Sequence, residues 1–280
     1  MTSAIKYLLS GVLICLLLAF SVDAGSKAPG WSHDLSAALT GSQTSLKDWT
    51  AGGDNALSWV LLLEGDSILR QEAFRWTTKY RFNFGQSKVG DRGIRKTEDR
   101  INMETSITWD RGWAVDPFLS TSLRTQFAPG YRYGTIRKQV SAVFDPAYWT
   151  HTAGIGHKAK AWSLRSGLAL REIVTRDYVQ WSDDKGTPEK ETIRIDGGIE
   201  TVGSVKWKLA KSAKWTSEGK LFVPLTDTDA TALRTTHSLA VTLARYLTIR
   251  LRFQGNNDPT AFEGWQLKEA LTMGVQYDFF

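Results

Sequence analysis

Apolar and polar residues alternate with a period of two along much of this chain, the spacing at which side chains appear on one face of a β-strand. In segment 74–84 the even positions are Phe, Trp, Thr, Tyr, Phe and Phe, and the odd positions are Arg, Thr, Lys, Arg and Asn. Segments 101–109, 193–209 and 265–279 follow the same pattern. These runs exceed the five or six residues usual in soluble sheets, and many carry Trp or Tyr near their ends. They therefore predict strands that cross a membrane.

The whole pattern predicts about twelve strands. Their expected ranges are 32–43, 56–64, 71–84, 96–109, 113–128, 139–156, 161–173, 191–209, 213–225, 235–244, 247–254 and 265–279. Short turns are expected at 65–67, 110–112, 157–158, 211–212 and 245–246, and longer loops at 44–55, 85–95, 129–138, 174–190, 226–234 and 255–264. Strands joined by alternating short turns and long loops are typical of outer-membrane barrels, whereas Greek-key links do not keep this rhythm. We predict an all-β fold, a transmembrane up-and-down antiparallel β-barrel with its short turns in the periplasm.

The first 24 residues predict a secretory signal peptide. Lys6 precedes an apolar run at 7–20, and Val22-Asp23-Ala24 is a cleavage site of the small-x-Ala kind. The expected domains are a signal peptide at 1–24 and an outer-membrane barrel at 25–280. The single cysteine, Cys15, lies in the signal peptide, so we expect a mature chain without disulfides.

The end of the sequence indicates the outer membrane of a Gram-negative bacterium. From Leu271 to Phe279 every second residue is apolar, as a strand facing lipid requires. We predict that Tyr277, Phe279 and Phe280 form the assembly signal, which the barrel-assembly machinery recognises during insertion. The other expected partner is outer-membrane lipid. The sequence does not indicate an oligomeric state.

The polar faces of the strands carry more basic than acidic residues. The residues predicted to line the lumen are Arg75, Lys79, Arg81, Arg100, Glu104, Arg124, Arg165, Arg194, Glu200, Arg250 and Arg252. Eight strands leave room only for side chains and sixteen to eighteen leave a water-filled channel, so twelve is intermediate. Two interpretations stay open. One is a narrow channel for small solutes, preferably anionic. The other is a structural or ligand-binding barrel with a closed, ion-paired lumen, which acts through its extracellular loops.

Charge and composition exclude several other classes of function. The net charge is +6, yet acidic residues are scattered among the basic ones and no basic tract appears, so we expect no nucleic-acid partner. Metal-ligand spacings and glycine-rich phosphate loops are absent from the sequence, and we expect no cofactor and no metal.

Enzymatic activity would require a nucleophile or base at the outer rim of the barrel. The histidines are His33, His151, His157 and His237. His237, next to Ser238 at a predicted outer strand end, is the best candidate. Neighbouring residues of a strand point to opposite faces, however, so these two side chains cannot pair. We expect no enzymatic activity, and a barrel hydrolase is the weaker alternative.

Four motifs, at 42–55, 95–99, 123–131 and 144–148, resemble those of the DUF3078 proteins, predicted outer-membrane β-barrels of Bacteroidetes and Chlorobi type. The resemblance implies the same fold and location, and it brings no activity or catalytic residues. Members of that family commonly end at an aromatic-x-Phe, here Tyr277-Asp278-Phe279, so Phe280 is an extra residue. In the first motif, 49–55 is either an ordered turn or a ligand loop. Residues 95–100 are either an ion-pair network at the rim or a solute-binding patch.

Overall fold

The strand pairing of this protein closes on itself, because β1 pairs with both β2 and β14. The computed structural model describes residues 30–45, 54–110, 113–183, 186–260 and 262–279. The wall strands are β1 (Gly30–Thr44), β2 (Ala56–Arg70), β3 (Arg75–Val89), β4 (Arg92–Thr108), β5 (Asp116–Thr125), β8 (Ala147–Lys158), β9 (Trp162–Val174), β10 (Ile193–Lys208), β11 (Ala213–Pro224), β12 (Ala232–Thr242), β13 (Leu247–Asp258) and β14 (Phe262–Asp278). All neighbours are antiparallel, so the predicted twelve-stranded up-and-down barrel is confirmed.

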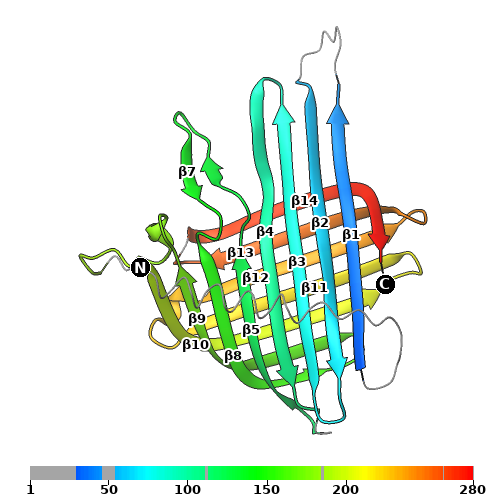
Figure 1. The fold of residues 1–280 in the computed structure, drawn as a ribbon, viewed down its shortest axis with the longest axis vertical. Helices are drawn as coiled ribbons and strands as arrows, with labels where there is room; N and C mark the ends of the chain where they lie inside the picture. The colour runs from blue at the N-terminus through cyan, green and yellow to red at the C-terminus, as the bar shows by residue number, and fades with distance from the viewer. Residues whose placement is uncertain (1–29, 46–53, 111–112, 184–185, 261, 280) are drawn as a thin grey trace.

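The strands are strongly tilted against the barrel axis. In Figure 1, β1 to β4 run nearly vertically on the near side, and β11 to β14 cross behind them at a steep angle. This crossing is expected, because a sheet can close into a barrel only if its strands tilt. Side chains from the two crossing walls therefore meet inside.

The connections lie at two opposite ends of the barrel, and the longest ones share one end. At one end, the turn end, are the connections 71–74, 109–115, 159–161, 209–212 and 243–246. At the other, the loop end, are 45–55, 90–91, 126–146, 175–192, 225–231 and 259–261. The loop end also carries the small sheet of β6 (Gly130–Arg132) and β7 (Lys138–Ser141), which projects from the barrel in Figure 1, and the 3-10 helices η1 (Val179–Trp181) and η2 (Thr228–Ala230).

The two longest described loops at this end are bonded to each other. The buried Asp145 accepts a hydrogen bond from the backbone N–H of Asp177 through Oδ2 at 2.7 Å. The indole of Trp181 donates to the carbonyl oxygen of Val140 at 3.4 Å. The loop after β9 is thereby held against the excursion between β5 and β8.

The turn predicted at 65–67 is wrong. Gly-Asp-Ser is a common turn sequence, but here it lies inside β2, and the chain turns at 71–74 instead. Gly65 is used for close packing, because a Cβ at this position would collide with the carbonyl oxygen of Asp34 and the hydroxyl of Tyr80.

Two of the predicted long loops are also wrong. Most of 85–95 belongs to β3 and β4, which end at a tight turn formed by Gly90 and Asp91. Gly90 has a φ of 56°, a conformation that glycine adopts without steric cost. Most of 255–264 likewise belongs to β13 and β14. Both hairpins lengthen the wall towards the loop end.

The outer surface of the wall is apolar and exposed. Leu267 is 80% exposed, Leu271 71% and Leu168 67%, although all three lie within strands. Such a surface suits lipid, since apolar side chains of this size are rarely left exposed together in water. Among the described residues, no helix is long and apolar enough to cross a membrane. The predicted signal peptide at 1–24, the loop residues 49–53 and Phe280 lie outside the described residues.

Candidate functional site

The candidate site is the polar interior of the barrel. Strand pairing and side-chain contacts place the eleven residues predicted to line the lumen on one face of the wall, the face that turns inward. Arg81 contacts Glu64 on the neighbouring strand at 3.0 Å, and Arg250 contacts the same carboxylate from β13 at 3.6 Å. Because β13 and β2 are not neighbours in the wall, the second contact crosses the interior.

Other ion pairs also cross the interior. Glu104 on β4 meets Arg165 on β9 at 2.6 Å, and Lys268 on β14 meets Glu98 on β4 at 2.6 Å. Neither pair joins neighbouring strands. These contacts join strands that are not neighbours in the wall, and they narrow the interior.

A buried carboxylate, that of Glu200 on β10, is held from two other strands. Lys220 on β11 approaches its Oε2 at 2.7 Å, and Thr152 on β8 donates to its Oε1 at 3.0 Å. Lys220 also reaches Ser122 on β5 at 3.5 Å. The middle of the interior is therefore occupied by paired charges.

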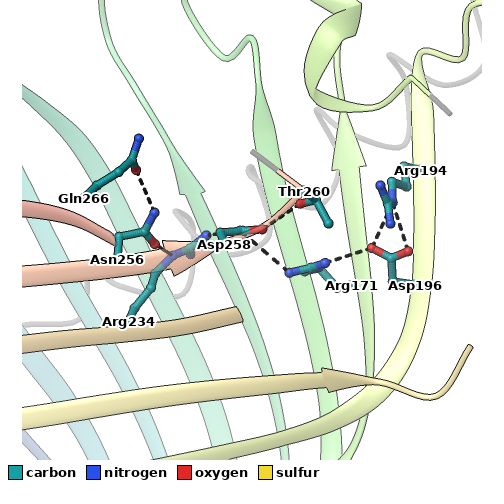
Figure 2. Close-up of polar contacts among 8 residues, drawn as sticks. All are labelled: Arg171, Arg194, Asp196, Arg234, Asn256, Asp258, Thr260 and Gln266. Carbon is teal, nitrogen blue, oxygen red and sulfur yellow. Dashed lines mark hydrogen bonds and ion pairs between the residues drawn. The ribbon is translucent and has the colours of Figure 1, made fainter. Parts of the chain in front are cut away.

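Near the loop end the ion pairs join into a longer network around Asp258 (Figure 2). Arg234 donates to Oδ2 of Asp258 at 3.2 Å and to Asn256 at 2.8 Å, while Thr260 donates to Oδ1 of Asp258 at 2.6 Å. Arg171 on β9, which is not a neighbour of β13 in the wall, lies 4.0 Å from the same carboxylate. We call these five residues the Asp258 network.

Arg171 links this network to a second carboxylate. It donates to Asp196 on β10 at 3.0 Å, and Arg194 approaches Asp196 from the same strand at 3.0 Å (Figure 2). Both aspartates are almost fully buried. Charges removed from water in this way are stable only when they are paired and hydrogen-bonded, as these are.

Two further arginines add positive charge to this region. Arg124 stacks on the ring of Tyr148, with its guanidinium carbon 3.9 Å from the centroid, and Arg234 lies 5.9 Å from the same ring. Arg124 and Arg100 interact electrostatically with each other, and neither has a carboxylate within 4.0 Å in the described part of the chain. The Nε of Arg124 is buried without a hydrogen-bond partner there. Positive charge therefore exceeds negative charge.

The turn end of the interior is also basic. Lys79, Lys158, Lys206 and Lys214 are exposed there, and Lys206 interacts electrostatically with Lys79 and Lys214. The acidic groups Asp66 and Glu218 oppose Lys206. A lysine-rich mouth at one end and an arginine cluster near the other enclose the paired charges in the middle.

A small cavity remains between the two crossing walls. Its volume is about 70 Å³, and its lining includes Thr40, Asn83, Glu98, Arg250 and Arg252. This space suits water or a small ion rather than a large solute.

Sequence reasoning missed several interior residues, among them Glu64, Arg171, Arg234 and Asp258. The sequence predicts a strand that ends at Glu64, whereas β2 continues for six more residues, to Arg70. Arg234 and Asp258 fell in predicted loops that are strands. Arg171 has the same strand parity as Arg165, so alternation alone could have identified it.

The rim motif at 95–100 contains an ion pair that is bonded to the loop after β5. Lys96 contacts Asp99 at 2.6 Å, and Asp99 accepts from the backbone N–H groups of Phe127 and Ala128 at 2.7 and 2.9 Å. The motif thus holds the start of the loop after β5 against β4.

The histidines face outward rather than into the interior. His237 lies in the middle of β12, not at its outer end as the sequence suggested, and shares a 2.8 Å hydrogen bond with Ser217 on β11. Ser238, next along the strand, faces the other way. The described residues contain no group of three or more His, Cys, Asp or Glu that could hold a metal ion.

A family model described as "Protein of unknown function (DUF3078)" matches residues 42–131. The match includes three of the four motifs that resemble this family, those at 42–55, 95–99 and 123–131, so the resemblance is confirmed over this segment. No curated protein matches the chain.

Solved structures similar to this chain include a translocator domain and two channels. The translocator domain of autotransporter NalP from Neisseria meningitidis has a TM-score of 0.40 and 12% identity, over 99% of this chain and 96% of that one. The COG4313 outer membrane channel from Pseudomonas putida F1 has a TM-score of 0.41 and 12% identity, over 92% and 99%. A deletion mutant of the TodX monoaromatic hydrocarbon channel has a TM-score of 0.37 and 9% identity, over 94% and 82%.

Proposed function

We propose that this protein is a narrow outer-membrane channel for small anionic solutes. Its place is the outer membrane of a Gram-negative bacterium, reached after removal of residues 1–24 and insertion by the barrel-assembly machinery. The turn end faces the periplasm and the loop end faces outward. The chain acts without enzymatic chemistry.

The excess of guanidinium groups near the loop end carries this proposal. Arg100 and Arg124 lack carboxylate partners among the described residues, while Arg171 and Arg234 share Asp258. Uncompensated positive charge inside a low-dielectric wall attracts anions and repels cations. The exposed lysines at the turn end extend the positive field to the other mouth.

The ion pairs that cross the interior set the size of the solute. Glu104–Arg165 and Glu98–Lys268 occupy the space between opposite walls. A solute must pass beside them, and the cavity at Arg250 and Arg252 has a volume of only about 70 Å³. We therefore expect transport of small inorganic or carboxylate anions rather than sugars or peptides.

Single-channel recording in planar lipid bilayers tests the proposal. The wild type should give small current steps, and its reversal potential in a KCl gradient should show a preference for chloride. Arg124→Gln should weaken this preference, more so at low salt, where charges are screened least. Arg137→Gln is the matched control, because Arg137 stacks on Tyr131 in the projecting β6–β7 excursion, away from the interior.

A closed barrel is the second candidate, and the same cross-interior ion pairs favour it. If the wild type shows no conductance and Arg124→Gln changes only stability, the anion channel is refuted. The bonded loops at the loop end would then be the place to seek a binding function, beginning with the contact of Asp145 with Asp177.

A further inference from the structure

A row of polar side chains crosses the outer, lipid-facing surface of the barrel. It consists of the cross-strand partners His33, Ser67, Thr78, Thr105, Thr121 and His151, on six successive strands of the wall. We call it the polar row. An alternating strand would place apolar residues at these positions, as it does on either side of the row.

Members of the row bond to one another. Thr78 and Thr105 share a hydrogen bond of 3.1 Å, and Thr121 shares one of 2.9 Å with Nδ1 of His151. The indole of Trp76 donates to the hydroxyl of Thr105 at 2.7 Å. Polar groups in contact with hydrocarbon need such partners, so the row is compatible with a membrane-facing wall.

The wall is hollowed where the row crosses β4, β5 and β8. The hollow is shallow and open to the surroundings of the wall, and the space within it is about 630 Å³. Trp76, Leu119, Leu168 and Leu170 form apolar sides, and Thr105, Thr121 and His151 supply polar groups. Its lining contains no Asp, Glu, Lys or Arg among the described residues. The occupant should therefore be uncharged and largely apolar.

The side chain of His151 indicates which polar group the occupant should carry. Its Nδ1 is engaged with Thr121, and Nε2 has no partner in the described part of the chain. Depending on the tautomer, Nε2 either donates or accepts one hydrogen bond. A hydroxyl group can bond to Nε2 in either tautomer, because it is both a donor and an acceptor.

From this geometry we propose that the hollow binds a neutral, membrane-soluble alcohol. The hydroxyl of the ligand bonds to Nε2 of His151, and its hydrocarbon part lies between Trp76 and Leu168. The site is on the outside of the wall, so the proposal is independent of conduction through the interior.

Photolabelling with 1-hexadecanol that carries a diazirine in mid-chain tests this site. The full-length mature protein is reconstituted in phosphatidylcholine vesicles, irradiated and digested, and the labelled peptides are identified by mass spectrometry. Label should concentrate on β4, β5, β8 and β9. Unlabelled hexadecanol should compete about fivefold better than hexadecane, the effect of roughly one hydrogen bond.

Matched variants separate the hollow from the rest of the apolar surface. Leu168→Trp fills the hollow and should remove most of the label, whereas Leu267→Trp, the same change at an exposed position of β14, should leave it unchanged. His151→Phe should retain labelling but abolish the advantage of hexadecanol over hexadecane. Heat-modifiable migration on SDS gels verifies that each variant is folded.

Three results would overturn the proposal. Label spread evenly over all outward strands means that the probe only dissolves in the surrounding lipid. Equal competition by hexadecanol and hexadecane in the wild type means that no hydrogen bond is made. Absence of label together with chemical cross-links between copies at Leu168 means that a second copy covers the hollow.

Discussion

Glu104 on β4 and Arg165 on β9 form a 2.6 Å ion pair across the barrel interior, although β5 and β8 lie between these strands in the wall. About a fifth of each side chain is exposed, 22% for Glu104 and 20% for Arg165. The pair therefore links β4 and β9, two strands that have no backbone pairing with each other. Its removal should affect both stability and the width of the interior.

Glu104→Gln should lower the free energy of unfolding by about 2–3 kcal/mol, less than the roughly 3–5 kcal/mol for breaking a fully buried pair. The loss arises because Arg165 keeps its charge without its partner. Urea titration of the protein in vesicles, followed by tryptophan fluorescence, measures it. The double variant Glu104→Gln/Arg165→Gln should recover part of the loss. Strict additivity of the two single changes would show that the pair contributes no coupling.

Asp258→Asn should be among the most destabilising single changes in the interior, by roughly 3–5 kcal/mol. It leaves Arg171 and Arg234 without their shared carboxylate, next to Arg124. Because the region then has still more unpaired positive charge, sulfate should stabilise the variant more than the wild type. Asp177→Asn is the control, since Asp177 is exposed and pairs with Arg176 in a loop. An equal response of all three proteins to sulfate would contradict an anion-attracting cluster.

The number of strands and the facing of their side chains were predictable because both follow from a period of two. Arg81 and Phe82 are consecutive residues of one strand, so their side chains point to opposite faces. The interior favours a polar residue at Arg81, and lipid favours an apolar residue at Phe82. The positions of turns were less predictable. The tripeptide Gly65-Asp66-Ser67 has turn chemistry, but here Gly65 provides room for Tyr80 and Asp34.

The contacts across the interior could not be predicted from alternation. Alternation says that Glu64 and Arg250 face inward, but not that they meet, because their distance depends on tilt and on how far the barrel is flattened. The hollow on the outer wall could not be predicted from alternation either. The polar row is visible only after the strands are aligned, since Thr105 and Thr121 are unremarkable in sequence and become neighbours through pairing.

Charge on the outer face should prevent assembly, while the same charge on the inner face should be tolerated. Met273→Lys places an ammonium against lipid, which costs roughly 2–4 kcal/mol near the middle of the bilayer. Met273 is 54% exposed on β14. Thr40→Lys is the matched control, because Thr40 lines the interior cavity, where the new charge faces polar side chains rather than lipid. The yield of folded, heat-modifiable protein in the membrane fraction measures both. Similar yields for the two variants would refute the assignment of faces.

The seam between β1 and β14 closes the barrel with few paired residues. Its pairing runs from Ser36 opposite Asp278 to Thr40 opposite Gly274, whereas β1 and β2 pair along their whole length. At the end of the seam, the backbone N–H of Phe279 donates to the carbonyl oxygen of Leu35 at 2.8 Å.

Deletion of residues 277–280 should therefore abolish closure as well as the predicted assembly signal. It removes two of the five residue pairs in the seam, and also the contact of the Tyr277 ring with Tyr246, whose centroids are 5.9 Å apart. The truncated chain should accumulate in the periplasm in a protease-sensitive form, as measured by fractionation and trypsin digestion.

Tyr277→Ala/Phe279→Ala, which keeps the backbone of the seam, separates the two causes. If that variant inserts normally while the deletion does not, backbone pairing is what matters; if both fail, the aromatic side chains are the signal. Normal membrane levels of the deletion itself would refute both explanations.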